Sequence, residues 1–429
     1  MKEISIIQFK KEIENGKKWI LLSEKIYNVE NFMTLHPGGG KIISSYIGRD
    51  ATDAWTAMHP DKRYVNKFLK ALEVGNLMHE NAIFEKSESS DIIKDYREIR
   101  NMAGKRFLFS SSMSFFVFQY LQIVLFETAA WLSLFLFGVN FYSYILCCLL
   151  ITTAQAQAGW TQHDYGHLSV FNTRRLNKIM HHLIIGHIKG ASSSWWNFRH
   201  NLHHSKPNVI KTDPDINAPY LFLLGSKLPK EWARKNKGFM PYNFQHQYFF
   251  IFGPPILLPI YFHYENMYFM LKRCKIKDLL LTISFFVKFF FLYSIFFDSW
   301  FSVFSLYMTS RFFESFWFTM VTQMSHLPME VDRDQHLDWV SQQLVSTRNV
   351  TSNWFNDWFT GHLNFQIEHH LFPDMPRHNY HLIKPQIQEF CRKHGLLYVE
   401  KSLLIAFLDI IRSLRNSGSL WLEAYKNPG

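Results

Sequence analysis

The sequence predicts a mainly α, polytopic membrane protein with about four transmembrane helices and a histidine-rich cytosolic cap, preceded by a small α+β domain. Three observations predict this class. Aromatic residues make up 17% of the 429 residues, with 42 Phe, well above ordinary globular usage. The apolar residues are concentrated in the middle of the chain, between polar ends. Three histidine groups with metal-ligand spacing lie in or beside that apolar part.

Residues 1–80 are predicted to form the α+β domain. Residues 19–22 and 25–29 are expected to be short strands around a tight turn, followed by helices and the loop His36-Pro37-Gly38-Gly39-Gly40. Proline and glycines fix a loop whose backbone can approach a large flat group. A second histidine, His59, follows the segment DATDAW.

The HPGG loop and the DATDAW segment resemble cytochrome b5. The resemblance implies that His36 and His59 bind a haem b from opposite faces. With both axial positions filled, such a haem passes single electrons and has no open position for oxygen. The alternative interpretation is a glycine turn with two unrelated histidines.

Residues 81–106 are predicted to link this domain to a membrane domain over 107–429. Residues 81–90 are a polar linker, and 91–106 are a charged amphipathic lead-in. Residues 115–137 and 141–160 are each long enough to cross a bilayer, with Glu127 as a buried polar exception. They form a hairpin whose second helix continues beyond the membrane and presents His163 and His167. The Lys- and Arg-rich stretch that follows makes this side cytosolic.

A second hairpin is predicted over 279–297 and 300–321. Arg311 and Glu314, at i and i+3 on its return helix, are expected to pair inside the bundle. The return brings His326 to the cytosolic edge. Between the hairpins, 248–271 is apolar but interrupted by glycine and prolines, and we prefer an in-plane or re-entrant segment to a crossing one.

Three histidine boxes carry the chemistry: HDYGH at 163–167, RHNLHHS at 199–205 and QIEHH at 366–370. Helix positions i, i+3 and i+4 share one face, so His200, His203 and His204 are expected to converge, and the third box likewise. A lone histidine is usually a core or surface residue, but three such groups favour metal binding. The predicted catalytic and metal-binding set is His163, His167, His200, His203, His204, Gln366, His369 and His370, with His326 as a further ligand.

Eight imidazoles exceed the needs of one metal, so two metals are implied. Imidazole suits iron, zinc and copper alike. One-electron delivery from a fused haem is useful only to a redox-active pair, so two non-haem iron ions are the prediction.

Other residues near the boxes are expected to have supporting or structural roles and not to bind metal directly. Asp164 and His362 are expected to orient ligands by hydrogen bonds, and 213–215 is expected to be a turn. Glu368 falls between the ligand faces. His181, His182 and His187 are interpreted as ordinary helix or surface residues, and Trp195, Trp196, Trp354 and Trp358 as packing or interface residues.

All three boxes resemble those of the integral-membrane fatty acyl desaturases, H-x3-4-H, H-x2-3-HH and [HQ]-x2-3-HH. Gln366 and the N-terminal domain narrow the resemblance to front-end desaturases, of the animal Δ5 or Δ6 type. Further matches are GHIKGASSSWWNFRHNLHHSKPN (186–208) and NDWFTGHLNFQIEHHLFPDMPRHN (356–379), and the resemblance covers nearly the whole chain.

The resemblance implies insertion of a cis double bond between an existing double bond and the carboxyl end of a polyunsaturated acyl-CoA. Oxygen is reduced to water by electrons from NADH, which pass through cytochrome b5 reductase and the fused haem. It also implies a multi-pass protein of the endoplasmic reticulum membrane, surrounded by membrane lipid, with both termini and the active site cytosolic.

Composition narrows the alternatives. The net charge of +11 fits cytosolic loops on the membrane surface, and no nucleic-acid partner is expected. Four cysteines show neither a disulfide framework nor zinc spacing, and we expect no signal peptide. Two other functions stay open: a haem-fused fatty acyl or sphingolipid hydroxylase or desaturase, and a membrane-anchored haem protein that only carries electrons.

Overall fold

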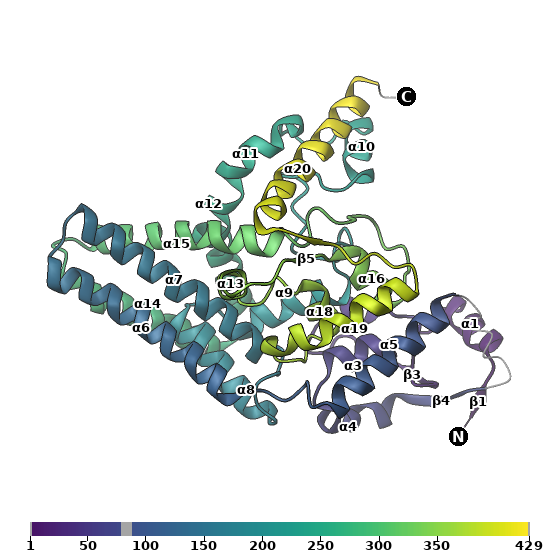
Figure 1. The fold of residues 1–429 in the computed structure, drawn as a ribbon. Helices are drawn as coiled ribbons and strands as arrows, with labels where there is room; N and C mark the ends of the chain where they lie inside the picture. The colour runs from purple at the N-terminus through teal and green to yellow at the C-terminus, as the bar shows by residue number, and fades with distance from the viewer. Residues whose placement is uncertain (1, 79–87, 428–429) are drawn as a thin grey trace.

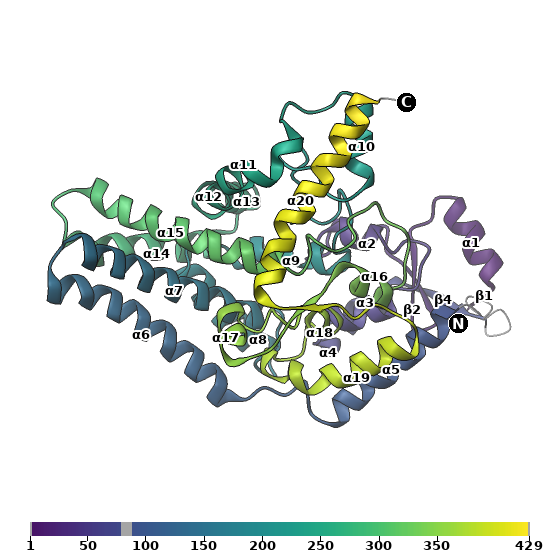
Figure 2. The same ribbon diagram turned by 45° about the horizontal axis from the view of Figure 1, so that its top comes forward.

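The computed structural model describes residues 2–78 and 88–427, and helices dominate it. The N-terminal domain lies at one end of the molecule, and two long helical hairpins extend from the other (Figure 1). A cap of shorter helices lies between them, and the tilted view of Figure 2 keeps the same order. The cap is therefore placed where the hairpins and the N-terminal domain meet.

The N-terminal domain is a four-stranded sheet covered by short helices. Its strands are β1 (Glu3–Ile4), β2 (Trp19–Leu22), β3 (Lys25–Asn28) and β4 (Glu73–Leu77), and its helices are α1 (Ile6–Glu14), α2 (Gly40–Ser44), α3 (Thr52–Met58) and α4 (Lys62–Leu72). The sheet order is β1-β4-β3-β2, with β1 parallel to β4 and the other pairs antiparallel. Ser23 and Glu24 form the predicted tight turn with φ of 48° and 69°. Both predicted strands are confirmed, the second ending at Asn28.

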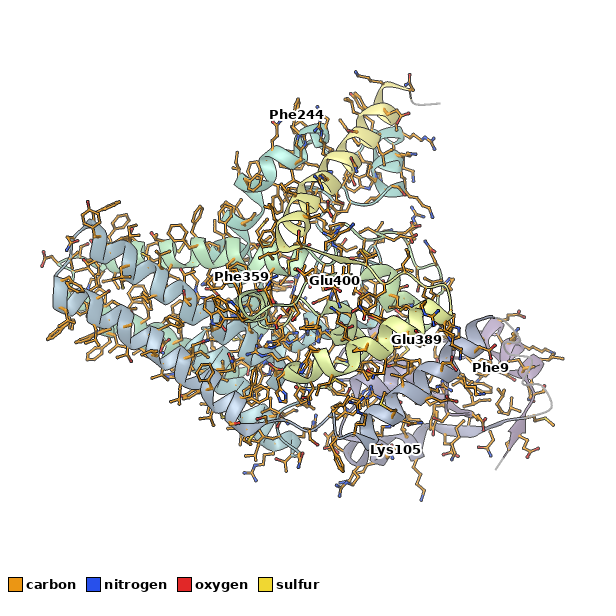
Figure 3. The ribbon with its side chains drawn as sticks, in the orientation of Figure 1. Phe9, Lys105, Phe244, Phe359, Glu389 and Glu400 are labelled. Atoms are coloured by element: carbon orange, nitrogen blue, oxygen red, sulfur yellow. The ribbon has the colours of Figure 1, made fainter. Side chains whose placement is uncertain are left out.

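The two hairpins form where the sequence predicts them. They consist of α6 (Met113–Phe137) with α7 (Phe141–Gly166) and α14 (Ile276–Ser294) with α15 (Trp300–Gln323). The Asn140 side chain begins α7 by accepting hydrogen bonds from the backbone of Tyr142 and Ser143. Among the described residues, α6 and α7 are the two helices long and apolar enough to cross a membrane by length and composition. Side chains at the outer end of the hairpins are mainly carbon (Figure 3). The four-span topology stays a prediction.

Helix α5 (Glu88–Lys105) holds the N-terminal domain to the rest of the chain. Residues 81–87 of the predicted linker lie outside the described residues, and 88–90 belong to α5. Arg97 forms two hydrogen bonds of 2.8 Å with Asp53 of α3. One turn later, Arg100 pairs with Asp374 at 2.5 Å, beyond the third box. The apolar core on this side is continuous, because Tyr46 and Ala54 of the first domain pack in one cluster with residues of the cap. The predicted domain boundaries themselves stay predictions.

The cap and its connections are made of short elements. They are α8 (Arg174–His181), the π-helical η2 (His182–Ile188), α9 (Ser193–Ser205), α10 (Lys227–Arg234), η3 (Tyr242–Phe244), α16 (Trp339–Ser346), β5 (Asn349–Val350), α17 (Trp354–Thr360), α18 (Gln366–Leu371), η5 (Arg377–Asn379), α19 (Tyr380–Lys393), β6 (Glu400–Lys401) and α20 (Leu403–Lys426). Strands β5 and β6 pair in parallel and fasten the segment before the third box to the chain beyond α19.

The apolar stretch 248–271 is broken, as its glycine and prolines predict. It contains parts of α11 (Gln245–Phe252) and α13 (His263–Lys272), separated by α12 (Pro254–Ile256) and the π-helical η4 (Leu257–Phe262). The break is at Gly253, before two prolines. Whether this segment crosses a membrane or lies in its plane stays a prediction.

Candidate metal centre

Four segments bring all eight predicted histidines together. The C-terminal end of α7 carries His163, with His167 directly after it, α9 carries three histidines, α18 carries two, and His326 lies three residues after α15. They gather into two groups. Cluster one is His163, His167, His200, His204 and His369, and cluster two is His203, His326 and His370. Within each cluster the candidate ligand nitrogens all lie within 4.8 Å of one another.

The nitrogens of cluster one lie at the spacing that a bound metal imposes. His200 Nε2 is 2.8 Å from His167 Nε2 and 3.0 Å from His204 Nε2. A ring nitrogen offers either one N–H or one lone pair, so His200 Nε2 can form only one good hydrogen bond with these two neighbours. Metal–imidazole bonds of roughly 2.1 Å at right angles place two ligand nitrogens roughly 3 Å apart. The residues of cluster one therefore fit a metal ion.

Cluster two is smaller and fully buried. Ring centroids are 4.5 Å apart for His203 and His326, 5.0 Å for His203 and His370, and 4.8 Å for His326 and His370. The prediction that His326 joins the boxes in space is confirmed.

The clusters divide two of the sequence boxes. The expectation that His200, His203 and His204 converge on one site is wrong for His203, which joins cluster two. The third box divides in the same way, with His369 in cluster one and His370 in cluster two. Successive helical residues point roughly 100° apart, so the two histidines of an HH pair face different sites.

Hydrogen bonds fix the ring orientations in both clusters. His203 Nδ1 is 2.9 Å from Asp213 Oδ2, and His326 Nδ1 is 3.0 Å from the Ser346 carbonyl. On α18, the Nδ1 atoms of His369 and His370 are each 2.9 Å from a polar oxygen, Tyr380 Oη and Gln343 Oε1. An Nδ1–H donor in each ring leaves the Nε2 lone pair free as a metal ligand. The Nε2 atoms of His369 and His370 are buried and have no hydrogen-bond partner among the described residues.

Burial keeps most of these rings neutral, which is the form that binds metal. It lowers the pKa of His167 to about 3 and that of His326 to about 3, and in both the charge of His203 acts in the same direction. Burial also opposes charge on His203, but the adjoining Asp213 carboxylate raises the pKa of His203 above its ordinary value. Asp213 therefore makes His203 the most basic ring of cluster two.

The Gln366 amide lies beside cluster two. Its Nε2 is 2.8 Å from His326 Nε2, and the side chain is buried. Amide oxygen and nitrogen exchange places on a half-turn of the group. Such a turn would put the amide oxygen at the distance from His326 that neighbouring metal ligands have.

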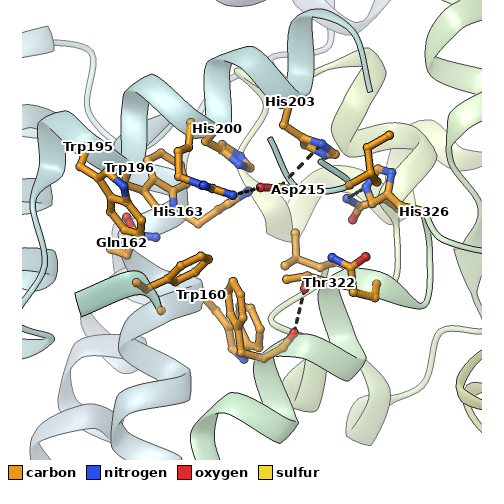
Figure 4. Close-up of a pocket in the computed structure, with 18 residues that line it drawn as sticks. Trp160, Gln162, His163, Trp195, Trp196, His200, His203, Asp215, Thr322 and His326 are labelled. Atoms are coloured by element: carbon orange, nitrogen blue, oxygen red, sulfur yellow. Dashed lines mark hydrogen bonds and ion pairs between the residues drawn. The ribbon is translucent and has the colours of Figure 1, made fainter. Parts of the chain in front are cut away.

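A cavity of about 90 Å³ opens beside the clusters. His163, His200, His203 and His326 line one side, and Trp160 and Thr322 line the other (Figure 4). A second cavity of about 100 Å³ shares its aromatic wall of Trp160, Trp195, Trp196, Phe262 and Phe318 and reaches into the helical bundle. Trp195 and Trp196 thus line both cavities, and the interpretation that they are packing or interface residues stays a prediction. The two cavities adjoin at this wall and are together called the passage; their lining is mainly apolar, and the histidines border the first cavity.

Three buried charges lie at the bundle end of this passage. Glu314 accepts hydrogen bonds of 2.5 Å from Arg311 and from Lys189, and Arg311 also donates to the Lys189 carbonyl. The predicted Arg311–Glu314 pair is confirmed. Lys189 was missed because it follows an apolar run, LIIGHI, where no acidic residue marks a partner.

The N-terminal domain places His36 and His59 opposite each other. Their ring centroids are 6.1 Å apart, and their Nδ1 atoms lie 3.4 Å and 2.9 Å from the Gly39 and Trp55 carbonyls. A metal–imidazole bond of roughly 2 Å on each side, plus the radius of each ring, accounts for this separation. Burial lowers the pKa of His59 to about 4, and the nearby His36 and Arg174 charges act in the same direction. The pair fits the two axial ligands of a haem.

Two predicted orienting residues have other roles. Asp164 accepts a hydrogen bond from the Arg377 backbone and lies 3.4 Å from Arg377 Nε, so it anchors the segment after the third box to α7. His362 packs on Phe115 and Phe365, and its Nδ1 has no partner among the described residues. The orienting carboxylate is Asp213, in the stretch interpreted as a turn. The available signal was the acidic sequence DPD, which begins nine residues after His204.

The other residues that the sequence analysis placed outside the ligand set also lie outside both clusters. Glu368 points away from both clusters and accepts hydrogen bonds from Asn349 and Tyr398. His181, His182 and His187 bond to Gln162, the Lys178 carbonyl and Ser284, outside the clusters. Trp354 is exposed, and Trp358 donates to Gln122.

Two family profiles match the sequence. The profile described as cytochrome b5-like heme/steroid binding domain covers residues 6–78, where His36 and His59 lie. The profile described as fatty acid desaturase covers residues 139–402, which is more than half of the chain and includes every histidine of both clusters.

Proposed function

The chain belongs to the fatty acid desaturase family, and we propose that it is a front-end acyl-CoA desaturase of the Δ5 or Δ6 type. It would place a cis double bond between an existing double bond and the carboxyl end of a polyunsaturated acyl chain. The observation that carries the proposal is the pair of buried histidine clusters at the end of a mainly apolar passage. Gln366 at the start of the third box and the fused cytochrome b5-like domain support the front-end type.

Iron is the proposed metal in both clusters. The donors are almost all imidazole, which leaves iron, zinc and copper open. The N-terminal domain decides among them, because two opposed histidines make an electron-carrying haem site, and single electrons serve only a redox-active metal. Cluster one would bind one iron through five histidines, and cluster two would bind the other through three, with Gln366 beside it. Iron measured in purified His326→Ala tests this division, since the variant should lose metal from cluster two.

The reaction removes one hydrogen from each of two neighbouring methylene groups. One O2, two electrons and two protons are consumed with these two hydrogens, and two water molecules and a double bond are formed. When bound, the iron pair supplies the oxidising power that unactivated C–H bonds require.

The chain's own residues position the substrate and the ligands. Trp160, Phe318 and Phe262 form an apolar wall that excludes water and holds the acyl chain alongside His163 and His200. Asp213, Gln343 and Tyr380 hold the ligand rings so that their Nε2 atoms face the metals. The buried charges at the bundle end oppose further entry of an apolar chain.

Electrons are proposed to pass from NADH through cytochrome b5 reductase and the haem to the iron pair. The N-terminal domain packs directly on α9, the helix that carries the second box. A Cβ on Gly39 would lie 3.0 Å from the Phe198 ring, and Tyr46 donates a hydrogen bond of 3.2 Å to the Ser205 carbonyl. The haem loop thus approaches the helix that carries three of the proposed metal ligands.

The proposed location is the endoplasmic reticulum membrane, with both hairpins crossing and the clusters, both termini and the haem domain cytosolic. This arrangement is supported by the two apolar hairpin helices and by the basic segments that follow them.

Expression in a yeast host supplied with 18- and 20-carbon polyunsaturated fatty acids tests the proposal. Mass spectrometry of the products should show a new double bond on the carboxyl side of an existing one. A product carrying a hydroxyl group would instead establish the hydroxylase alternative. His36→Ala should lose haem and NADH-driven activity while keeping iron, and normal desaturation by this variant without free cytochrome b5 would exclude the fused domain as electron source.

A further inference from the structure

We propose that Arg174, which lies outside the cytochrome b5-like domain in sequence, completes its haem site by pairing with the carboxylate groups at the haem edge. The inference rests on the part of the proposed function that assigns a haem to His36 and His59. It adds a residue of α8 to a site that the first domain otherwise builds alone.

Arg174 reaches across to the first domain. Its guanidinium carbon lies 3.9 Å from the centre of the Tyr64 ring on α4. None of the described Asp or Glu side chains forms an ion pair with Arg174, whereas Arg97 and Arg100 of α5 pair with Asp53 and Asp374. A partly buried arginine without a carboxylate, stacked on an aromatic ring, is arranged to receive an anion.

Tyr64 belongs to the rim of the haem crevice. A run of ring contacts joins it to the ligand: Tyr64 to Phe68 at 5.5 Å, Phe68 to Phe32 at 6.2 Å and Phe32 to His36 at 5.9 Å. Tyr64 and Phe68 are 41% and 42% exposed, so they stand at the mouth of the crevice and not in its interior. The guanidinium therefore lies where the crevice opens.

A haem carries two carboxylates on one edge, and that edge avoids the apolar interior of its pocket. The mouth beside Tyr64 offers these carboxylates the Arg174 guanidinium, a cation that comes from outside the first domain. Both the charge of Arg174 and its position at the mouth of the crevice therefore suit the haem carboxylates.

The same contact ties the haem edge to the metal centre. Arg174 is seven residues after His167 in the chain, and the short segment between them runs from cluster one to the start of α8. A haem held by Arg174 would be held in a fixed relation to cluster one.

Purified full-length protein with Arg174→Ala tests the inference, with Arg175→Ala as the matched control, because Arg175 is the neighbouring exposed arginine. Two properties are measured: the rate of haem transfer to an excess of apomyoglobin, and the haem midpoint potential by spectroscopic redox titration. Charge-assisted hydrogen bonds of this kind change binding on the order of tenfold. Arg174→Ala should therefore release haem about tenfold faster and be harder to reduce, because a nearby cation favours the ferrous state. Arg175→Ala should match the wild type.

Tyr64→Phe and Tyr64→Ala distinguish loss of the Arg174–haem pairing from general disruption of the N-terminal domain. The Phe variant keeps the ring under the guanidinium and should behave as wild type, whereas the Ala variant should shift both properties toward those of Arg174→Ala. Unchanged haem release and potential in Arg174→Ala would overturn the inference. Neither readout depends on the iron pair or on product formation, so a failure of the desaturase assay would leave this test intact.

Discussion

His204 and His370 stack nearly face to face, with ring centroids 4.3 Å apart and planes 21° apart, although they belong to different clusters. His204 comes from α9 and His370 from α18, and both rings are fully buried. The stack is a direct contact between the two proposed iron sites. Substitution of either histidine should therefore weaken metal binding at both proposed sites.

His204→Ala should abolish desaturation and lower the iron content, while the haem spectrum stays unchanged because the haem lies in another domain. We expect turnover to fall more than about 100-fold, the upper range for loss of an outer-shell metal partner. Product analysis, iron determination and the haem spectrum check this. His381→Ala, which removes an exposed histidine on α19, is the control. Retained turnover in a well-expressed His204→Ala would remove His204 from the ligand set.

Asp213→Asn should weaken iron binding by about 10- to 100-fold, because the amide orients His203 less firmly and no longer supports its charge. Iron retained after graded chelator treatment measures the effect. Asp215→Asn is the comparison, since Asp215 is 3.8 Å from the same ring and pairs more closely with Arg199. Equal iron retention in the two variants would contradict the assignment of Asp213.

Gln366→Ala should stay folded and haem-loaded but be sharply less active, because the amide lies 2.8 Å from His326 beside cluster two. Gln366→Glu should also lose activity, since an added negative charge favours ferric iron. Turnover at matched iron content is the measurement. Near-normal turnover in Gln366→Ala would show that the third box contributes only its two histidines.

Glu314→Gln should destabilise the protein by about 3–5 kcal/mol, because Lys189 and Arg311 would be left buried without a counter-charge. Thermal unfolding in detergent measures this. The double variant Lys189→Gln with Glu314→Gln restores the original net charge of the group and should be more stable than the single variant. A double variant that is less stable would mean that hydrogen bonding, and not charge balance, dominates here.

Stability should fall as the pH is lowered from 7.5 to 5, and His362 should contribute to the fall. Burial lowers the pKa of His362 to about 3, and nearby Arg377 acts in the same direction. The unfolded chain, with a histidine pKa of about 6.5, binds more protons in this range, so acid favours unfolding by about 2 kcal/mol at pH 5. Unfolding temperatures at both pH values check this. His362→Gln should show a smaller loss, and an identical loss would exclude His362 as a source.

The sequence predicted the hairpins and the gathering of the histidines because both depend on local periodicity. Apolar runs bounded by Gly138 and Asn140 define helix ends, and box spacing places rings on a helix face. Periodicity alone did not show which rings each histidine of a box would meet, because the partners of His203, which are His326 and His370, come from other segments of the chain.

Residues that act through long-range contacts were missed. Gln343 and Tyr380 carry no motif, and each reaches its ring only when α16 and α19 pack against α18. Lys189 finds Glu314 across 125 positions of sequence. Asp164 and His362 were misassigned for the converse reason: each is close to a box in sequence, but its side chain points to other partners.

The paired histidines on α9 and α18 connect the two clusters covalently. His203 and His204 are consecutive, as are His369 and His370, and each pair contributes one ring to each cluster. The two clusters are therefore connected twice through a single peptide bond. Inserting a single residue inside either pair would rotate one ring by roughly 100° and remove it from its cluster.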